Sequence, residues 1–288
     1  MKWISLEQSL FPGFVRFIIK NEWKSVSLTS RLLDPQGNFR QIRSLNSRIF
    51  YLKASGLPDI MGVVMITPTG LFLPMLSPEL PLYDTFFRNS TIRFLSSCRK
   101  ISCIMGTDSD VNAFKNLVNL QIRTEIEYDL MAADLPLEQS FIPRDFLKIK
   151  RAEEKDAEKL LPLEEKYMID EVLLASSYLK KKAVLKNLRD NCRNQILLYV
   201  ERDGIPAAKA NTNALGINYA QIGGVFTDYT HRRNGFSSIL IKQLQFESAK
   251  LRKKSILFVK KNNKPAVNLY LKTGFKKIDN YRIVYINF

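Results

Sequence analysis

The chain has 288 residues, enough for one large domain or two ordinary ones, and it carries a formal net charge of +16. Its 45% hydrophobic and 25% charged residues are typical of a folded globular protein and exclude collagen-like and low-complexity chains. Three scattered cysteines, Cys98, Cys103 and Cys192, exclude a disulfide framework and a C-x-x-C metal site, and they predict a reducing compartment.

The N-terminal residues do not resemble a targeting segment. Residues 1–21 contain Glu7 and Pro12 and lack an uninterrupted apolar core. No later run approaches the ~20 apolar residues that a membrane-spanning helix needs. We therefore expect a cytoplasmic protein that is neither exported nor embedded in a membrane.

The positive charge is concentrated in the C-terminal half. Residues 1–144 hold 16 Lys and Arg against 13 Asp and Glu, which leaves 28 against 15 for residues 145–288. A basic half can capture phosphates or attract an acidic partner such as RNA or a ribosome. The basic runs Lys180–Lys182 and Arg252–Lys254 have no interleaved aromatic residues. A solvated surface is therefore favoured over nucleic-acid binding.

The first half predicts strands that alternate with helices. An apolar face at Phe14, Ile18 and Ile19 predicts helix between Trp3 and Leu33. Strands are expected at Ile49–Lys53, Met61–Thr67, Leu71–Met75, Ile101–Met105 and Glu125–Met131, and helices at Tyr83–Leu95 and Asp110–Leu117. This alternation indicates an α/β layer.

A polar stretch with two prolines separates the halves. Residues 136–145 contain Pro136 and Pro143 and predict a linker. Beyond it, helices are expected between residues 157 and 189. Strands are expected at Phe146–Lys150, Ile196–Glu201, Ala207–Thr212, Tyr219–Thr227, Ser255–Val259 and Tyr281–Asn287.

The most informative stretch runs from Gly223 to Phe275. It begins as a strand, a short turn with two arginines and a glycine, and an amphipathic helix. Gly235 can take backbone angles closed to other residues and lets the chain approach a ligand oxygen. Arg232 and Arg233 add charge-assisted donors. Because the helix N-terminus also presents unsatisfied N–H groups, the turn predicts a pyrophosphate site.

Two motifs in this stretch resemble those of the GNAT acetyltransferase superfamily. Arg232-x-x-Gly235-x-Ser237 is similar to the acetyl-CoA pyrophosphate loop of that family, R/Q-x-x-G-x-G/A, and departs from it at Ser237. Residues 259–275, V-x-x-x-N-x-x-A-x-x-L-Y-x-x-x-G-F, are similar to the closing strand–helix–strand segment of the family. Either motif alone could be ordinary turn and core chemistry, whereas their joint order and spacing favour the resemblance.

The resemblance implies an N-acetyltransferase that uses acetyl-CoA as cosubstrate, requires no metal and passes the acetyl group directly to an amine acceptor. It implies that Tyr270 is the general acid that protonates the departing thiolate. It also implies that backbone N–H groups near the end of the central strand polarise the thioester carbonyl. The implied coenzyme-binding residues are Val225, Phe226, Thr227, Arg232, Arg233, Asn234, Gly235, Phe236, Ser237 and Asn263.

No motif identifies the general base. Asp170 and Glu171 lie in the segment that borders the acceptor pocket in this fold, and either could relay a proton through water. A helix cap or a surface charge is an equally good interpretation. Glu171 is our candidate catalytic carboxylate. His231, the only histidine, adjoins Arg232, which lowers its proton affinity, so we place it at the coenzyme rim.

Segments of the first half recur in the second. Residues 48–58 parallel residues 195–206, and Val111–Phe114 parallels Val267–Tyr270 in the same order. We therefore expect two tandem GNAT-like domains of the α/β (α+β) class, each a mixed, mostly antiparallel twisted sheet flanked by helices.

The expected domains are residues 1–135 and 146–288. The first copy has no arginine-x-x-glycine turn after its central strand, and Phe114 stands where the second copy has Tyr270. Since phenylalanine cannot donate a proton, we expect the first copy to bind no coenzyme and to be inactive in transfer.

Two functional classes remain open: an N-acetyltransferase, and a non-catalytic acetyl-CoA sensor or scaffold. Tyr270 favours the enzyme, because a sensor needs no leaving-group acid. The acceptor could be a small amine, an amino acid, a peptide N-terminus, a lysine side chain or an aminoacyl-RNA. The extra domain could also serve as a homodimer surface.

Overall fold

The computed structural model describes residues 1–6, 12–34, 36–37, 46–53, 60–98, 101–118, 120–136, 149–174 and 178–287. The expected linker falls almost entirely outside these ranges, so the domain boundary at 136–145 stays a prediction. Among the described residues, no helix is long and apolar enough to cross a membrane.

The described part of the first half contains six strands and the helices between them. Its elements are β1 (Lys2–Ser5), α1 (Pro12–Lys20), η1 (Glu22–Lys24), α2 (Val26–Leu32), β2 (Arg48–Lys53), β3 (Ile60–Ile66), β4 (Leu71–Leu76), α4 (Thr85–Ser97), β5 (Cys103–Thr107), α5 (Asp108–Lys115) and β6 (Ile122–Ala133). β3 is buried along its whole length, as a strand covered on both faces requires.

The second half repeats this succession. Its elements are β7 (Ile149–Arg151), η3 (Glu154–Asp156), α6 (Ala157–Tyr167), the π-helical turn η4 (Met168–Val172), α7 (Lys181–Asn194), β8 (Leu197–Arg202), β9 (Ile205–Leu215), β10 (Tyr219–Thr227), η5 (Tyr229–His231), α8 (Phe236–Lys250), β11 (Lys254–Lys260), α9 (Lys264–Lys272) and β12 (Lys276–Ile286).

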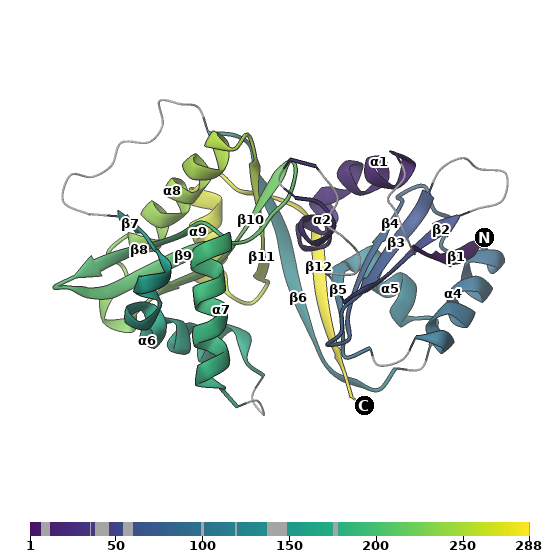
Figure 1. Cartoon of the computed structure of the whole chain (residues 1–288), viewed down its shortest axis with the longest axis horizontal. Helices are drawn as coiled ribbons and strands as arrows, with labels where there is room; N and C mark the ends of the chain where they lie inside the picture. Colours follow the sequence, from purple (N-terminus) through teal and green to yellow (C-terminus); the bar gives the residue numbers. More distant parts are fainter. Residues whose placement is uncertain are drawn as a thin grey trace.

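The twelve strands of the described residues form one sheet in the order β1-β2-β3-β4-β5-β12-β6-β11-β10-β9-β8-β7. Among them, β4–β5 and β10–β11 pair in parallel, and the other neighbours are antiparallel. The last strand of each half lies against the other half: β6 pairs with β11, and β12 pairs with β5. Figure 1 shows β6 and β12 side by side between the two groups of elements.

The strand order repeats about the line between β12 and β6. Counted outward from that line, each strand of the first half has a counterpart at the same position in the second half. The parallel pair β4–β5 thus corresponds to β10–β11. The sequence repeats are therefore confirmed as two similar tandem units. The sequence did not indicate that the units exchange their final strands.

Both faces of the sheet are covered in each half. In the first half, α1 and α2 pack on one face and α4 and α5 on the other (Figure 1). In the second half, α8 and α9 cover one face and α6 and α7 the other. A further cluster, which includes Val26, Tyr128 and Tyr281, lies at the junction of the halves.

One expectation for the first half is wrong. Residues 2–5 form the edge strand β1, which pairs with β2, where we expected helix to begin at Trp3. Trp3 is 8% exposed, stacks on Phe94 and donates an indole hydrogen bond to Thr91 at 3.0 Å. These long-range contacts override the local helical pattern, which does hold from Pro12 to Leu32 apart from one short 3-10 turn.

Glu22 connects the first half to the second through hydrogen bonds. Its side chain is fully buried and accepts hydrogen bonds from the backbone N–H groups of Asn218, at 2.9 Å, and Tyr219, at 3.3 Å. The turn that it holds joins β9 to β10. Lys253 donates to the Gly216 and Ile217 carbonyls of the same turn.

We predict that Glu22→Ala lowers the free energy of unfolding by about 2–4 kcal/mol, because it leaves buried N–H donors without an acceptor. Urea denaturation measures the loss. The matched control is Glu79→Ala, which removes an exposed carboxylate with a 3.8 Å ion pair to Lys20 and should cost less than about 1 kcal/mol. Equal losses in the two variants would show that Glu22 does not fasten the halves.

Candidate functional site

The central feature of the second half is a gap between two parallel strands. β10 pairs with β11 only from Tyr219 to Gln221, although β10 continues to Thr227 and β11 to Lys260. A cavity of about 320 Å³ lies at this divergence. Its walls include Ile222, Val259 and Tyr270 from the core under α8 and α9. Tyr128 and Ile283, from the junction cluster on the other face, also line it, so the cavity passes through the sheet.

A bulge in β10 shapes one wall of this cavity. The register between β10 and β9 shifts between Gly223 and Phe226, and Gly224 has a φ of +57°. A Cβ atom at Gly224 would lie 1.8 Å from the side-chain oxygen of Asn211, so only glycine fits. The bulge interrupts the ladder at Gly224 and Val225, so these two residues of the cavity lining are not paired with β9.

A buried lysine holds the bulge in place. Lys209 on β9 is fully buried, and its ammonium donates to the Gly224 carbonyl at 2.9 Å. It pairs with Glu164 of α6 at 2.7 Å and lies 4.5 Å from the centre of the Tyr167 ring. The ammonium therefore connects the bulge, the neighbouring strand and the covering helix.

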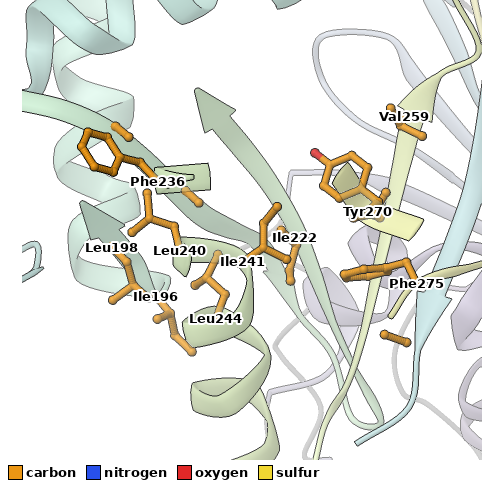
Figure 2. Packing of buried hydrophobic residues seen from close by; sticks show 14 of the residues in the cluster. Ile196, Leu198, Ile222, Phe236, Leu240, Ile241, Leu244, Val259, Tyr270 and Phe275 are labelled. Carbon is orange, nitrogen blue, oxygen red and sulfur yellow. The ribbon is translucent and has the colours of Figure 1, made fainter. Parts of the chain in front are cut away.

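The predicted pyrophosphate turn lies where β10 leads into α8. Gly235 has a φ of +78° and forms the N-cap of α8, while Arg233, at +66°, is also left-handed. A Cβ atom at Gly235 would meet nothing within 4 Å, so the space in front of the helix N-terminus is open. Phe236 is 3% exposed and anchors the helix in the core (Figure 2).

Side-chain contacts brace this turn. Ser237, the residue that departs from the motif, shares a 2.7 Å hydrogen bond with Thr227 and so ties the strand end to the helix. The Arg232 guanidinium lies 4.3 Å from the centre of the Tyr229 ring. Asn234 donates to the His231 carbonyl at 3.0 Å. The arginine-x-x-glycine-x-serine segment thus forms a braced, solvent-facing turn.

Tyr270 projects from α9 into the cavity wall. It is 8% exposed and packs against Phe275 with ring centres 5.8 Å apart. Figure 2 shows its hydroxyl directed away from Phe275. Burial, and secondarily the charge of Glu171, raise the pKa of Tyr270 well above its usual value, so the phenol keeps its proton at neutral pH. Asn263 caps the same helix by accepting from Ala266 N at 3.2 Å.

The two candidate carboxylates lie in different places. Glu171 lines the cavity, where Lys260 donates to its backbone carbonyl at 2.8 Å and pairs with its carboxylate at 3.4 Å. Asp170 instead accepts from the Tyr229 hydroxyl and lies 3.9 Å from Arg232, at the arginine-x-x-glycine turn. His231 also lies at that turn, with its ring stacked 6.4 Å from Phe236. Of the three residues, only Glu171 lines the cavity.

Sequence reasoning missed the polar network on β9. Lys209, Asn211 and Asn213 alternate along the strand, a pattern that ordinarily predicts a solvated face. Here Lys209 and Asn211 are buried, and Asn211 donates to Asn213 at 2.9 Å. The Gly223-Gly224 pair on the facing strand was the available signal, since glycine within a strand often marks a bulge.

We predict that Lys209→Met lowers the free energy of unfolding by about 3–5 kcal/mol, because it leaves the Glu164 carboxylate buried without its partner. Adding Glu164→Leu removes that charge and should recover a large part of the loss. Chemical denaturation of both variants tests this. Lys181→Met, which removes an exposed lysine 3.4 Å from Glu165, is the matched control and should change stability by less than about 1 kcal/mol. A Lys209→Met variant that is as stable as the Lys181→Met control would contradict the role of Lys209 as the buried partner of Glu164.

Comparison with known proteins gives a match to one family model over part of the second half. Residues 206–284 match the model of the family described as FR47-like protein. A search of the curated proteins by sequence found no match.

Solved structures match the whole chain. A Drosophila protein known from an X-ray structure has a TM-score of 0.66 and 14% identity, over 99% of this chain and 98% of its own. A GNAT-family acetyltransferase from Colwellia psychrerythraea has a TM-score of 0.57 and 13% identity, over 100% of both chains. A tandem GNAT protein from the clavulanic acid biosynthesis pathway has a TM-score of 0.56 and 10% identity, over 98% and 97%. The sequence resemblance is thereby confirmed in the fold: this protein is a tandem GNAT-fold protein.

Proposed function

We propose that the second half transfers an acetyl group from acetyl-CoA to an amine acceptor. The observation that carries this proposal is the cavity through the sheet, with the Tyr270 phenol on its wall and the braced glycine turn at the end of the same strand, β10. The likeness in fold to a solved GNAT-family acetyltransferase supports the same class of reaction.

The turn at Arg232–Ser237 fits a pyrophosphate. The first N–H groups of α8 have no acceptor within the helix, and the helix dipole favours an anion there. Arg232 and Arg233 are exposed beside the open space at Gly235. We assign Arg232, Arg233, Asn234, Gly235, Phe236 and Ser237 to the diphosphate end of acetyl-CoA. Val225, Phe226, Thr227 and Asn263 would flank its pantetheine arm.

The chemistry needs few groups. The neutral amine attacks the thioester carbonyl, the new C–N bond forms, and the C–S bond then breaks. Backbone N–H groups at the β10 bulge stabilise the charge that develops on the carbonyl oxygen. Tyr270 gives its proton to the thiolate and regains one from the solvent or the acceptor. Because the pKa of Tyr270 is raised, the phenol still carries its proton when the C–S bond breaks and negative charge develops on the sulfur.

Glu171 is the proposed proton acceptor for the ammonium form of the acceptor. It lines the cavity, and Lys260 and Asn263 hold its carboxylate, both at 3.4 Å. No serine, cysteine or histidine nucleophile is required, since acetyl moves directly between the two substrates. Among the described residues, no cluster of three or more His, Cys, Asp or Glu side chains could hold a metal ion.

We propose that the first half binds no coenzyme, and a buried ion pair supports this. Lys24 is 5% exposed, donates to the Leu76 carbonyl at the end of β4 at 2.8 Å and pairs with Asp110 of α5 at 3.0 Å. β4 and α5 correspond to β10 and α9 in the second half. Lys24 therefore closes the space that the cavity occupies in the second half.

We predict that Gly235→Asp weakens acetyl-CoA binding at least about tenfold, since a repulsion of about 1.4 kcal/mol between the new carboxylate and the diphosphate is sufficient. Gly235→Asn has the same shape and the same positive φ without the charge, so it isolates the electrostatic part. Isothermal titration calorimetry on the two folded variants makes the comparison. Equal affinities of the two variants for acetyl-CoA would show that the diphosphate does not bind at this turn.

We predict that Tyr270→Phe lowers the turnover number by about 10²–10⁴-fold with little change in acetyl-CoA affinity, because it removes the acid and keeps the ring. Thiol release under saturating substrates measures turnover. Tyr281→Phe also removes a buried hydroxyl, but Tyr281 does not line the cavity, so it should leave turnover within about twofold. Unchanged turnover in the Tyr270 variant would assign the proton to water or to another residue.

A further inference from the structure

The cavity has an apolar wall on the face of the sheet opposite α8 and α9. This wall, called the aromatic wall below, consists of Ile126, Tyr128, Phe258, Ile283 and Tyr285. Ile126 and Tyr128 lie on β6, which belongs to the first half of the chain but pairs with β11 of the second. Strand exchange thus brings side chains from the first half into the candidate site.

The aromatic wall is closely packed and uncharged. Tyr128 meets Phe258 edge to face, with ring centres 5.3 Å apart, and Phe258 stacks on Tyr281 at 4.7 Å. Ile126 lies opposite Ile283 in the ladder between β6 and β12, so their side chains share this face. Such a surface favours a flat apolar group and offers a charged group no partner.

Charge within the cavity points to the same kind of ligand. Of the described residues that line it, Glu171 and Lys260 alone are charged, and they are paired with each other. Lys260 also donates to the Glu171 backbone carbonyl, so it is not a free cation for a ligand carboxylate. An ammonium can share the Glu171 carboxylate, whereas a second carboxylate would be buried unpaired.

We propose that the acceptor is a primary amine attached to an uncharged apolar body, preferably aromatic, and that the aromatic wall selects it. This inference rests on the proposed function, because it assigns the acceptor side of the same cavity. The amine would lie toward Glu171 and Tyr270, and the apolar body would contact Ile126, Phe258 and Tyr285. The first half would then act as a specificity element of the second.

Three amines test the proposal with the full-length protein and acetyl-CoA. 2-Phenylethylamine carries the amine and the ring, phenylalanine adds a carboxylate, and ethylamine lacks the ring. We expect kcat/KM for 2-phenylethylamine to exceed that for phenylalanine at least about tenfold and that for ethylamine at least about 100-fold. Phenylalanine or ethylamine matching 2-phenylethylamine would overturn the proposal.

A variant pair tests the wall itself. Ile126→Arg places a cation on the aromatic wall and should lower kcat/KM for 2-phenylethylamine at least tenfold while reducing its advantage over phenylalanine. Ile122→Arg makes the same change on the same strand, at a position that is 41% exposed and outside the cavity lining, and should have no effect. Tyr285→Ser, at a half-buried position near the end of β12, provides a second test if Ile126→Arg fails to fold.

Direct binding separates this inference from the proposed function. Calorimetry with 2-phenylethylamine in the presence of coenzyme A requires no turnover. The unmodified protein could bind 2-phenylethylamine without releasing thiol, and Ile126→Arg could abolish that binding. This result would support the acceptor site and refute acetyl transfer. Thiol release with ethylamine and phenylalanine as fast as with 2-phenylethylamine would support transfer and refute the aromatic wall. Activity that rises from acetyl-CoA to hexanoyl-CoA would assign the wall to the acyl chain and also overturn the proposal. If the protein showed neither binding of 2-phenylethylamine nor turnover, both the acceptor proposal and the proposed function would be refuted.

Discussion

The antiparallel ladder between β6 and β12 is the interaction on which the whole structure depends. It runs from Lys276 opposite Ala132 to Ile286 opposite Ile122, and it joins the last strand of each half at the centre of the sheet. Without it, β12 and β6 would each be an open edge, because their other neighbours are β5 and β11. The same ladder presents Ile126 and Ile283 to the cavity, so the contact that completes the fold also builds the candidate site.

Two buried lysines distinguish the halves. In the second half, Lys209 holds the β10 bulge from the neighbouring strand and leaves the space between β10 and β11 open. In the first half, Lys24 lies in the corresponding space and bridges Leu76 and Asp110. Each ammonium satisfies a backbone carbonyl and a carboxylate, as burial requires. A buried lysine thus lies beside the space between the parallel strands in the second half and inside the corresponding space in the first.

The sequence was sufficient for the repeated units, most strands and the glycine turn, because these depend on local spacing and on residue types with few alternatives. Gly235 and Tyr270 lie where the motifs place them, at the N-cap of α8 and on the cavity wall. Strand exchange was not predictable, because β6 and β12 have the same pattern whichever sheet they join. The division of Asp170 from Glu171 depends on a single π-helical turn, which has no sequence signature.

The exchange of strands also governs the order in which the chain can fold. Ile104 of β5 lies opposite Val284 of β12, although the two residues are separated by most of the chain. During synthesis, the edge of β5 that pairs with β12 therefore stays unpaired until residues 281–285 have left the ribosome. Such long-range pairing slows folding and exposes strand edges to other chains. The two halves consequently complete their shared sheet together, and loss of β12 would leave an unpaired edge on β5 of the first half and another on β6.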